Sequence, residues 1–237
     1  MPTTGVSHDI ELRPKTVLRR YMDVSKLLDL LHFNAIYIRR ADGFPDRLEG
    51  ALFPSHRGFL ERSHLAGYKP HDADHFYRRG RSGNYVSCWS RGPRDSMALW
   101  QLYGGARTSV AVITNVEELA RVAISWNRNV VINKVRYIDH RKVKTYVIGS
   151  YADMLKYKHL AYEYEHEIRL IVPQQGEGWE DNPMGIRLAV PDMARLIRRI
   201  VVAPEATSEF VEVVKGLVAR YGLRVPVVHS QLATAPV

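Results

Sequence analysis

The 237-residue sequence has a single cysteine, Cys88, and no long hydrophobic run. One cysteine cannot form an internal disulfide, and it cannot supply a cysteine-cluster metal site. No apolar stretch approaches the roughly 18 residues that a membrane-spanning helix needs, and the first residues lack the apolar centre of a signal peptide. The sequence therefore predicts a protein of the cytoplasm with no membrane contact.

Several common catalytic motifs are also missing. The sequence contains no G-x-x-x-x-G-K-[ST], no G-x-G-x-x-G, no G-x-S-x-G and no H-E-x-x-H. These patterns mark phosphate-binding loops, dinucleotide-binding loops, nucleophilic serines and zinc sites, respectively. Their absence argues against a P-loop ATPase, a Rossmann dehydrogenase, an α/β-hydrolase and a zinc protease.

The charge of the chain is strongly positive. Lys and Arg number 34 and Asp and Glu 25, which gives a formal net charge of +9 and favours polyanionic partners. The excess is concentrated between Arg39 and Arg94 and consists mostly of arginine, whose planar guanidinium suits phosphate. A solvated surface is the alternative interpretation. We expect a nucleic acid or another phosphate-rich macromolecule to bind at Arg39, Arg40, Arg78, Arg79 and Arg81.

Hydrophobic periodicity predicts a single α+β domain over 1–237, with mixed or antiparallel sheets flanked by helices. Residues 1–15 are expected to form an N-terminal arm, 41–83 a long basic excursion and 231–237 a tail. The predicted strands are 16–21, 35–40, 84–90, 108–114, 130–139, 144–148, 162–172, 186–190, 199–202 and 224–229. The predicted helices are 24–33, 95–103, 116–126, 151–160, a short one after Asp192, and 208–221.

The segment YEYEHEIRLIV, residues 162–172, carries the densest pattern of charge. On a strand, Glu163, Glu165, Glu167 and Arg169 share one face, because side chains alternate. Carboxylates lined up in this way, with an arginine at the end, are typical of acid–base chemistry or cation recognition. A solvent-facing edge strand is the alternative. We interpret the segment as part of a functional cleft.

A second pattern is SCWSRGPRDSMALWQLYGG, residues 87–105. By alternation Ser87 and Trp89 lie on one face of a strand and Ser90 on the other. Ser90, at the end of the strand, can present its hydroxyl to a ligand. Trp89 and Tyr103 offer stacking surfaces for a base or a nicotinamide ring, although such residues are equally common in a core.

Two adjacent arginines, Arg19 and Arg20, lie on the first predicted strand. Neighbouring side chains on a strand point to opposite faces, so one guanidinium can enter a cleft while the other faces solvent. A phosphate-binding arginine and a plain surface pair are both compatible with this pattern.

The chain resembles the bacterial domain-of-unknown-function family numbered 2971. The resemblance covers most of the chain and rests on LRRYM, IYIRRADGFPDRLEG, VSCWS, SMALWQLYGG and YEYEHEIRLIV. In the second of these elements, Phe44, Asp46, Glu49 and Gly50 match an F-x-D-x-x-E-G-like pattern.

More remotely, the order of an arginine on strand one, a serine on a middle strand and E-x-E on a late strand resembles ADP-ribosyltransferases. This resemblance implies a split sheet and NAD as the substrate, with no metal. The family's serine motif normally has hydroxyls on both sides of one residue, whereas this chain reads S-C-W-S. By position, the resemblance implies that Arg20 or Arg19 holds the pyrophosphate of NAD and that Ser90 or Ser87 binds the ribose. It further implies that Trp89 or Tyr103 stacks on the nicotinamide and that Glu167 or Glu165 stabilises the oxocarbenium-like transition state. Arg169 is a further cofactor-binding candidate.

Three functional hypotheses follow. The first is an NAD-consuming enzyme of bacterial or phage conflict, either an ADP-ribosyltransferase that acts on a nucleic acid or other macromolecule, or an NAD glycohydrolase. The second is a non-catalytic nucleic-acid-binding protein that uses the arginine-rich region. The third is a nuclease in which Glu163, Glu165 and Glu167 hold magnesium. The oligomeric state and the choice between Glu165 and Glu167 stay open.

Overall fold

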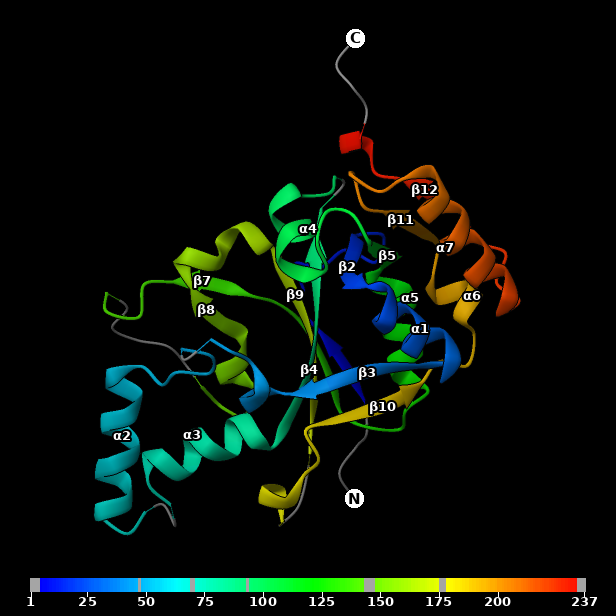
Figure 1. The fold of residues 1–237 in the computed structure, drawn as a ribbon. Helices are drawn as coiled ribbons and strands as arrows, with labels where there is room; N and C mark the ends of the chain where they lie inside the picture. The colour runs from blue at the N-terminus through cyan, green and yellow to red at the C-terminus, as the bar shows by residue number, and fades with distance from the viewer. Residues whose placement is uncertain are drawn as a thin grey trace.

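The computed structural model describes residues 5–46, 48–68, 71–92, 94–142, 148–174 and 178–233. Within these residues, ten strands form one mixed sheet, whose main path is β1-β6-β9-β4-β2-β5-β11-β12; β3 pairs with β4 and with β10 (Figure 1). Strands β7 (Arg136–Ile138) and β8 (Tyr157–His159) form a separate parallel pair. The strands of the large sheet are β1 (Val6–His8), β2 (Val17–Asp23), β3 (Ala35–Arg40), β4 (Asn84–Arg91), β5 (Ser109–Asn115), β6 (Val130–Lys134), β9 (Glu167–Pro173), β10 (Gly185–Ala189), β11 (Arg199–Val202) and β12 (Val227–His229).

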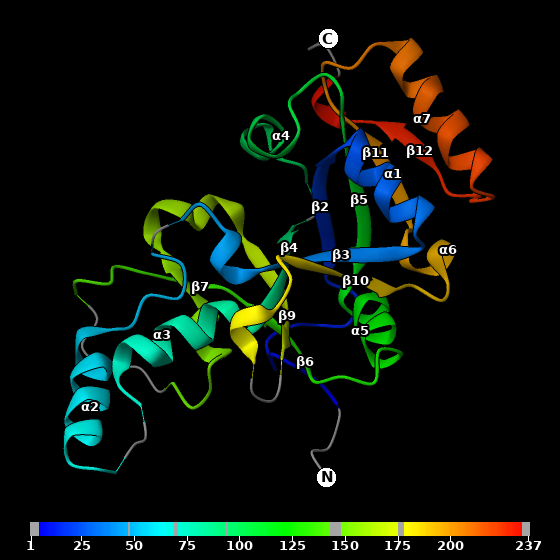
Figure 2. The ribbon, with the colours of Figure 1, turned by 60° about the horizontal axis from the view of Figure 1, so that its bottom comes forward.

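Helices flank this sheet, which confirms the predicted α+β class. Helices α1, α5, α6 and α7 gather around β5 and β11, whereas α2 and α3 lie beside each other at the opposite end of the molecule (Figures 1 and 2). The helices are α1 (Val24–His32), α2 (Pro54–Leu65), α3 (Ala73–Ser82), α4 (Met97–Tyr103), α5 (Val116–Ile124), α6 (Met193–Leu196) and α7 (Ser208–Arg220). The 3-10 helices are η1 (Ala41–Gly43), η2 (Asp153–Lys156), η3 (Leu160–Glu165), η4 (Trp179–Asp181) and η5 (Gln231–Ala233).

Local sequence signals account for most helix starts. The Asp23 side chain accepts a 2.9 Å hydrogen bond from the backbone N–H of Lys26 and caps α1, and Asn115 caps α5 through the N–H of Glu118. Leu27, together with two further leucines of α1, is buried. The amphipathic pattern therefore fixes both where α1 begins and which face it buries.

The sheet divides along one edge of β4. Near its start, Tyr85 and Val86 pair with β3; at its end, Ser90 and Arg91 pair with β2. Strand β9 pairs with β4 along its other edge, from Asn84 to Ser90. Strands β3 and β10 run across the direction of β2 and β5 in both views (Figures 1 and 2). The split leaves space between β2 and β3, next to the middle of β4.

Strand β9 separates two hydrophobic cores by simple alternation. Ile168, Leu170 and Val172 belong to the larger core, with α1, α5 and α7, whereas Ile171 belongs to a smaller core. Glu167 and Arg169 occupy the face of the smaller core, because they alternate in step with Ile171. This arrangement confirms the predicted division of faces from residue 167 onward.

The strand predicted over 162–172 is wrong in its first half. Residues 160–165 form η3, His166 has a left-handed backbone with φ of 44°, and β9 starts at Glu167. A left-handed residue interrupts the alternation of an extended strand, so Glu163 does not continue the row of Glu165 and Glu167. Glu163 is exposed, whereas the other two carboxyl groups are buried.

Other predicted elements also change. The predicted helix over 151–160 is η2 followed by β8, and the predicted strand over 130–139 is divided into β6 and β7. The excursion over 41–83 contains α2 and α3, and the N-terminal arm contributes β1, which pairs in parallel with β6. Of the predicted strand over 144–148, residues 144–147 lie outside the described residues, as do 234–237 of the predicted tail. No helix in the described ranges is long and apolar enough to cross a membrane.

Candidate functional site

A cavity of about 680 Å³ opens where the sheet divides. A volume of this size is typical of sites for small molecules and nucleotides. Its walls come from β2, β3, β4, α1, α4 and the segment that joins η3 to β9. The cavity brings together eight of the residues selected from the sequence: Arg19, Arg20, Arg39, Trp89, Ser90, Tyr103, Glu165 and Glu167.

Three of these residues lie in one row across three strands. Arg19 of β2 is the register partner of Ser90 of β4, and Ser90 is the partner of Glu167 of β9. Residues directly opposite each other in antiparallel strands project their side chains to the same face. The register therefore puts the side chains of Arg19, Ser90 and Glu167 on one face of the sheet, with Ser90 in the middle. A guanidinium N–H of Arg19 donates to the backbone carbonyl of Gly92, which fixes its orientation.

The two carboxylates of the cavity share a buried ammonium. Lys158 of β8 donates to Oε2 of Glu165 at 2.5 Å and lies 3.4 Å from Oε2 of Glu167. The hydroxyl of Tyr103, on α4, donates to Oε1 of Glu165 at 2.8 Å. These contacts hold both carboxylates at one end of the cavity, although they come from different elements.

A second buried cation supports Glu167 from within β9. Nε of Arg169 donates to Oε1 of Glu167 at 3.0 Å, and the two terminal nitrogens form a bidentate pair with Glu49. Arg169 and Glu49 are each 1% exposed. Three carboxylates, those of Glu49, Glu165 and Glu167, meet two cations, so the cluster has one negative charge in excess when all five groups are ionised.

The pKa values of Glu167 and its neighbours reflect the charges of this cluster. Burial would raise the pKa of Glu167, but the charges of Arg169 and Lys158 hold that pKa below its ordinary value. Burial would likewise lower the pKa of Lys158, yet the Glu167 and Glu165 carboxylates raise it. The pKa of the Cys88 thiol, which lines the same cavity, is raised by burial and by Glu167. Glu167 is therefore an anion and Cys88 a neutral thiol at neutral pH.

The wall nearer β2 and β3 is cationic. Arg20 donates to the backbone carbonyl of Tyr37 at 3.0 Å, and its guanidinium lies 5.8 Å from the centre of the Trp89 ring. The exposed Arg39 and the Arg187 side chain, which pairs with Asp29, also line this part. The cavity thus has an anionic end and a cationic wall.

The structure does not bring two of the predicted residues to the cavity. Ser87 is 1% exposed and its hydroxyl accepts a hydrogen bond from the indole N–H of Trp89 at 3.1 Å. Arg169 lies behind Glu167 and is held by Glu49 and Glu167. The expectation that they bind a cofactor directly is therefore not supported. Among the alternatives, the geometry favours Ser90 over Ser87.

The five arginines predicted to bind nucleic acid lie on β3 and α3. Arg40 pairs with Asp42, and the guanidinium of Arg81 lies over the ring of Tyr77. Arg79 lies over the rings of two aromatic residues. Arg78 and Arg39 are exposed, and Arg39 reaches the cavity. Three of the five thus make contacts within the protein.

Sequence reasoning assigned no role to the residues that support the carboxylates, although Glu49 was part of the F-x-D-x-x-E-G-like pattern. Lys158, Glu49 and Tyr137 are the main ones; the Tyr137 hydroxyl accepts a 2.7 Å hydrogen bond from the backbone N–H of Glu167. Nothing in the sequence MLKYKH, residues 154–159, sets Lys158 apart from the neighbouring Lys156. Periodicity contains no signal for the pairing of Glu49 with β9, since the partners are far apart in the chain.

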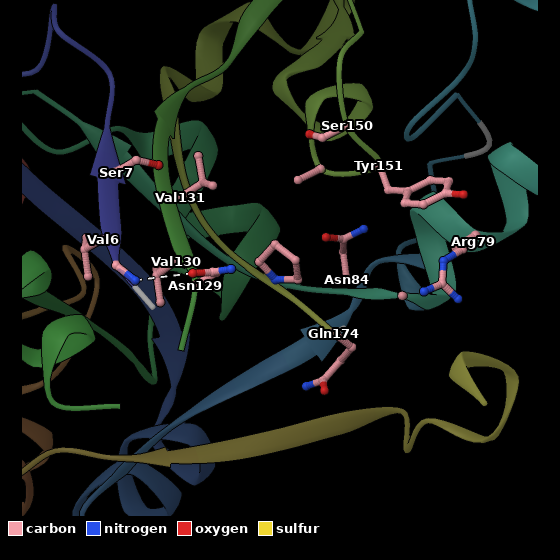
Figure 3. Close-up of a pocket in the computed structure, with 14 residues that line it drawn as sticks. Val6, Ser7, Arg79, Asn84, Asn129, Val130, Val131, Ser150, Tyr151 and Gln174 are labelled. Carbon is pink, nitrogen blue, oxygen red and sulfur yellow. Dashed lines mark hydrogen bonds between the residues drawn. The ribbon is translucent and has the colours of Figure 1, made fainter. Parts of the chain in front are cut away.

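A second cavity, of about 640 Å³, lies at the other end of β4 and β9 (Figure 3). Asn84 and Gln174 line it together with residues of β1 and β6, and no Asp or Glu is found among the described residues that line it. The amide oxygen of Asn84 is buried and has no hydrogen-bond partner in the described structure. None of the catalytic candidates reaches this cavity, so it is distinct from the candidate site.

The arrangement argues against the magnesium hypothesis. The carboxylates of Glu165 and Glu167 are bound to Lys158 and Arg169, and Glu163 is exposed and apart from them. Ammonium and guanidinium groups thus occupy positions next to the carboxylates at which a metal ion would have to bind. In the part of the chain that the structure describes, no group of three or more His, Cys, Asp or Glu side chains could hold a metal ion.

These features define an α+β protein with a bipolar cavity at the split of a mixed sheet. No family model matches the sequence and no curated protein matches it, so the resemblance to family 2971 stays a prediction. Among solved structures, the chain is similar to DarT from Thermus sp. 2.9 in complexes with carba-NAD+, with NAD+ and with ADP-ribosylated ssDNA. The sequence identities are 10%, 10% and 11%, and the TM-scores 0.42, 0.42 and 0.45. The alignments cover 93% of this chain and 97%, 98% and 96% of the DarT chains.

Proposed function

We propose that the protein consumes NAD and transfers ADP-ribose to an acceptor, either a nucleic acid or another macromolecule, or water. The observation that carries this proposal is the row of Arg19, Ser90 and Glu167 across β2, β4 and β9, inside a cavity that also contains Glu165. The sequence alone had suggested an Arg–Ser–Glu order, and the register gives that order a common face.

The chemistry requires a carboxylate near a developing positive charge. The bond between the ribose C1′ and the nicotinamide nitrogen breaks, and its electron pair goes to nicotinamide, which leaves neutral. The positive charge that develops at C1′ is stabilised by the carboxylates of Glu165 and Glu167. The acceptor then forms a bond to C1′ and loses its proton. Either carboxylate is placed to stabilise the charge or to orient the acceptor.

The cationic wall complements the other half of the substrate. Arg19 and Arg20 both line the cavity. They are suited to bind the pyrophosphate, because one guanidinium can donate two parallel hydrogen bonds to a phosphate group. Ser90 lies between Arg19 and Glu167 and suits the ribose hydroxyls. Tyr103 is 43% exposed and offers a ring for nicotinamide, whereas Trp89 is 2% exposed and packs in the core. We therefore favour Tyr103 over Trp89 as the stacking residue.

The test measures the release of nicotinamide from NAD by chromatography, with water, single-stranded DNA, RNA or protein as the acceptor. Wild-type protein is compared with Glu165→Gln and Glu167→Gln. Glu163→Gln is a matched control, because Glu163 lies in the same segment but is exposed and outside the cavity. We expect release with wild-type protein and with the control, and a loss of at least 100-fold in one of the two cavity variants.

Two results would contradict the proposal. No nicotinamide release by wild-type protein with any acceptor would exclude this activity. Salt-dependent binding of nucleic acid that is unchanged in both cavity variants, without release, would instead support a non-catalytic nucleic-acid-binding protein.

A further inference from the structure

Lys158 contacts both carboxylates of the cavity and is not one of the residues that line it. Its ammonium lies 2.5 Å from Glu165 and 3.4 Å from Glu167, and the side chain is 9% exposed. The ring of Tyr162 lies 4.5 Å from Nζ. A buried ammonium held between two carboxylates and an aromatic face has little freedom to move. Its role is therefore exerted on the carboxylates and not on a ligand.

The two carboxylates need such a partner because of how the chain presents them. Glu165 ends η3 and Glu167 begins β9, and the left-handed His166 between them turns both side chains toward β8. Two carboxylates in one buried place repel each other, and one of them takes up a proton unless a cation compensates. Lys158 supplies that compensation for both.

We infer that Lys158 is a positioning residue, which holds the carboxyl groups of Glu165 and Glu167 together at the anionic end of the cavity. The consequence for catalysis rests on the proposed function. The positioning itself follows from the contacts and can be tested without NAD.

The other charged and titratable groups near Glu165 and Glu167 do not contact the two carboxylates equally. Arg169 binds Glu167 and keeps part of its charge compensated when Lys158 is removed. In the described structure, Glu165 then retains the hydrogen bond from Tyr103 but has no other cation beside it. Removal of Lys158 should therefore disturb both carboxylates, and Glu165 more than Glu167. The remaining groups that face the cluster are Cys88 of β4, Tyr137 of β7, and Tyr162 and Tyr164 of η3.

The experiment titrates Glu167 by carbon NMR of glutamate carboxyl groups in wild-type protein, Lys158→Met and Lys158→Arg. We expect the Lys158→Met variant to raise the pKa of Glu167 by roughly one unit or more, because one of its two cations is lost. Lys158→Arg should restore most of the shift. Lys156→Met is the control, since Lys156 is two residues away and pairs with Asp153 outside the cavity.

Activity provides the second measurement. A carboxylate that must be ionised loses its function as the pH falls through its pKa. The acid limb of nicotinamide release in Lys158→Met should therefore move to higher pH by about the same amount as the Glu167 titration. At the pH optimum we expect at least a ten-fold loss of kcat, with Lys158→Arg closer to wild type.

The outcomes separate this inference from the proposed function. An unchanged Glu167 titration in Lys158→Met would overturn the inference, whether or not NAD is consumed. A shifted titration in a protein whose variants and wild type all fail to release nicotinamide would support the positioning role and contradict the proposed function. If Lys158→Met does not fold, Lys158→Gln takes its place under the same criteria, because its amide donates hydrogen bonds without a charge.

Discussion

Arg169 and Glu49 are 120 positions apart in the chain and form a bidentate ion pair that is almost completely buried. A further hydrogen bond joins the Arg169 guanidinium to the backbone carbonyl of Leu155 at 2.7 Å. Arg169 of β9 thus connects two other segments to the sheet: the segment around Glu49, within the basic excursion, and the segment around Leu155, before β8. The same arginine also contacts Glu167, so the scaffold and the candidate site share this residue.

Replacement of Arg169 by methionine should destabilise the protein by about 3–5 kcal/mol, because Glu49 and Glu167 lose a buried charge partner. Urea unfolding followed by circular dichroism measures the change. Arg57→Met is the matched control, since the Arg57–Asp74 pair is exposed and should contribute little. Similar stabilities of the two variants would show that the buried pair has no special structural role.

Replacement of Tyr103 by phenylalanine removes the hydrogen bond to Glu165 and keeps the ring. Hydrogen bonds to charged groups contribute about 1.5–3 kcal/mol, so we expect a loss of kcat for nicotinamide release of roughly 10- to 150-fold and a small change in KM. Tyr103→Ala also loses the ring and should raise KM. Leu102→Ala, on the same helix but outside the cavity, is the control. Full activity of Tyr103→Phe would exclude a role for the hydroxyl.

Cys88 should react slowly with iodoacetamide at neutral pH. Burial and the Glu167 carboxylate raise the pKa of its thiol, and the thiolate is the reactive form. Because the chain has a single cysteine, the labelled fraction measured by mass spectrometry reports on this site alone. Glu167→Gln removes the neighbouring negative charge and should accelerate labelling several-fold. A labelling rate that is independent of this substitution would contradict the proximity of the two groups.

Asp23 should stabilise the protein in a pH-dependent manner. Burial would raise the pKa of this carboxyl, but its hydrogen bonds with Lys26 and Ser25 at the start of α1 together lower that pKa from 3.8 to about 2. Because the folded-state pKa lies below the unfolded one, the contribution of the charge is complete above pH 3.8 and is lost as the pH falls toward 2.

The variant that tests this effect is Asp23→Ala, which we expect to lower the free energy of unfolding by about 1 kcal/mol at pH 7. The difference from wild type should shrink when the unfolding is repeated between pH 4 and pH 2. Asp23→Asn retains a side chain that caps helices and should be intermediate. A difference that is constant over this range would assign the effect to packing instead of charge.

The sequence alone determined most of the secondary structure and the division of faces in β9. Strand β3 follows from alternation, and α1, α5 and α6 begin directly after Asp23, Asn115 and Asp192, whose residue types cap helices. These features depend on residues close together in the chain, whose preferences are local. Arg19, Ser90 and Glu167 were also selected from the sequence, but without a means of choosing among their neighbours.

Tertiary structure decided which of these residues meet. The register between β2, β4 and β9 put Arg19, Ser90 and Glu167 in one row. The left-handed His166 and the 3-10 helix before it separated Glu163 from the two buried carboxylates. Lys158 and Glu49 joined the cluster through long-range ion pairs. No periodic pattern encodes such pairings, because they depend on the path of the chain between distant segments and on the cost of burying a charge without a partner.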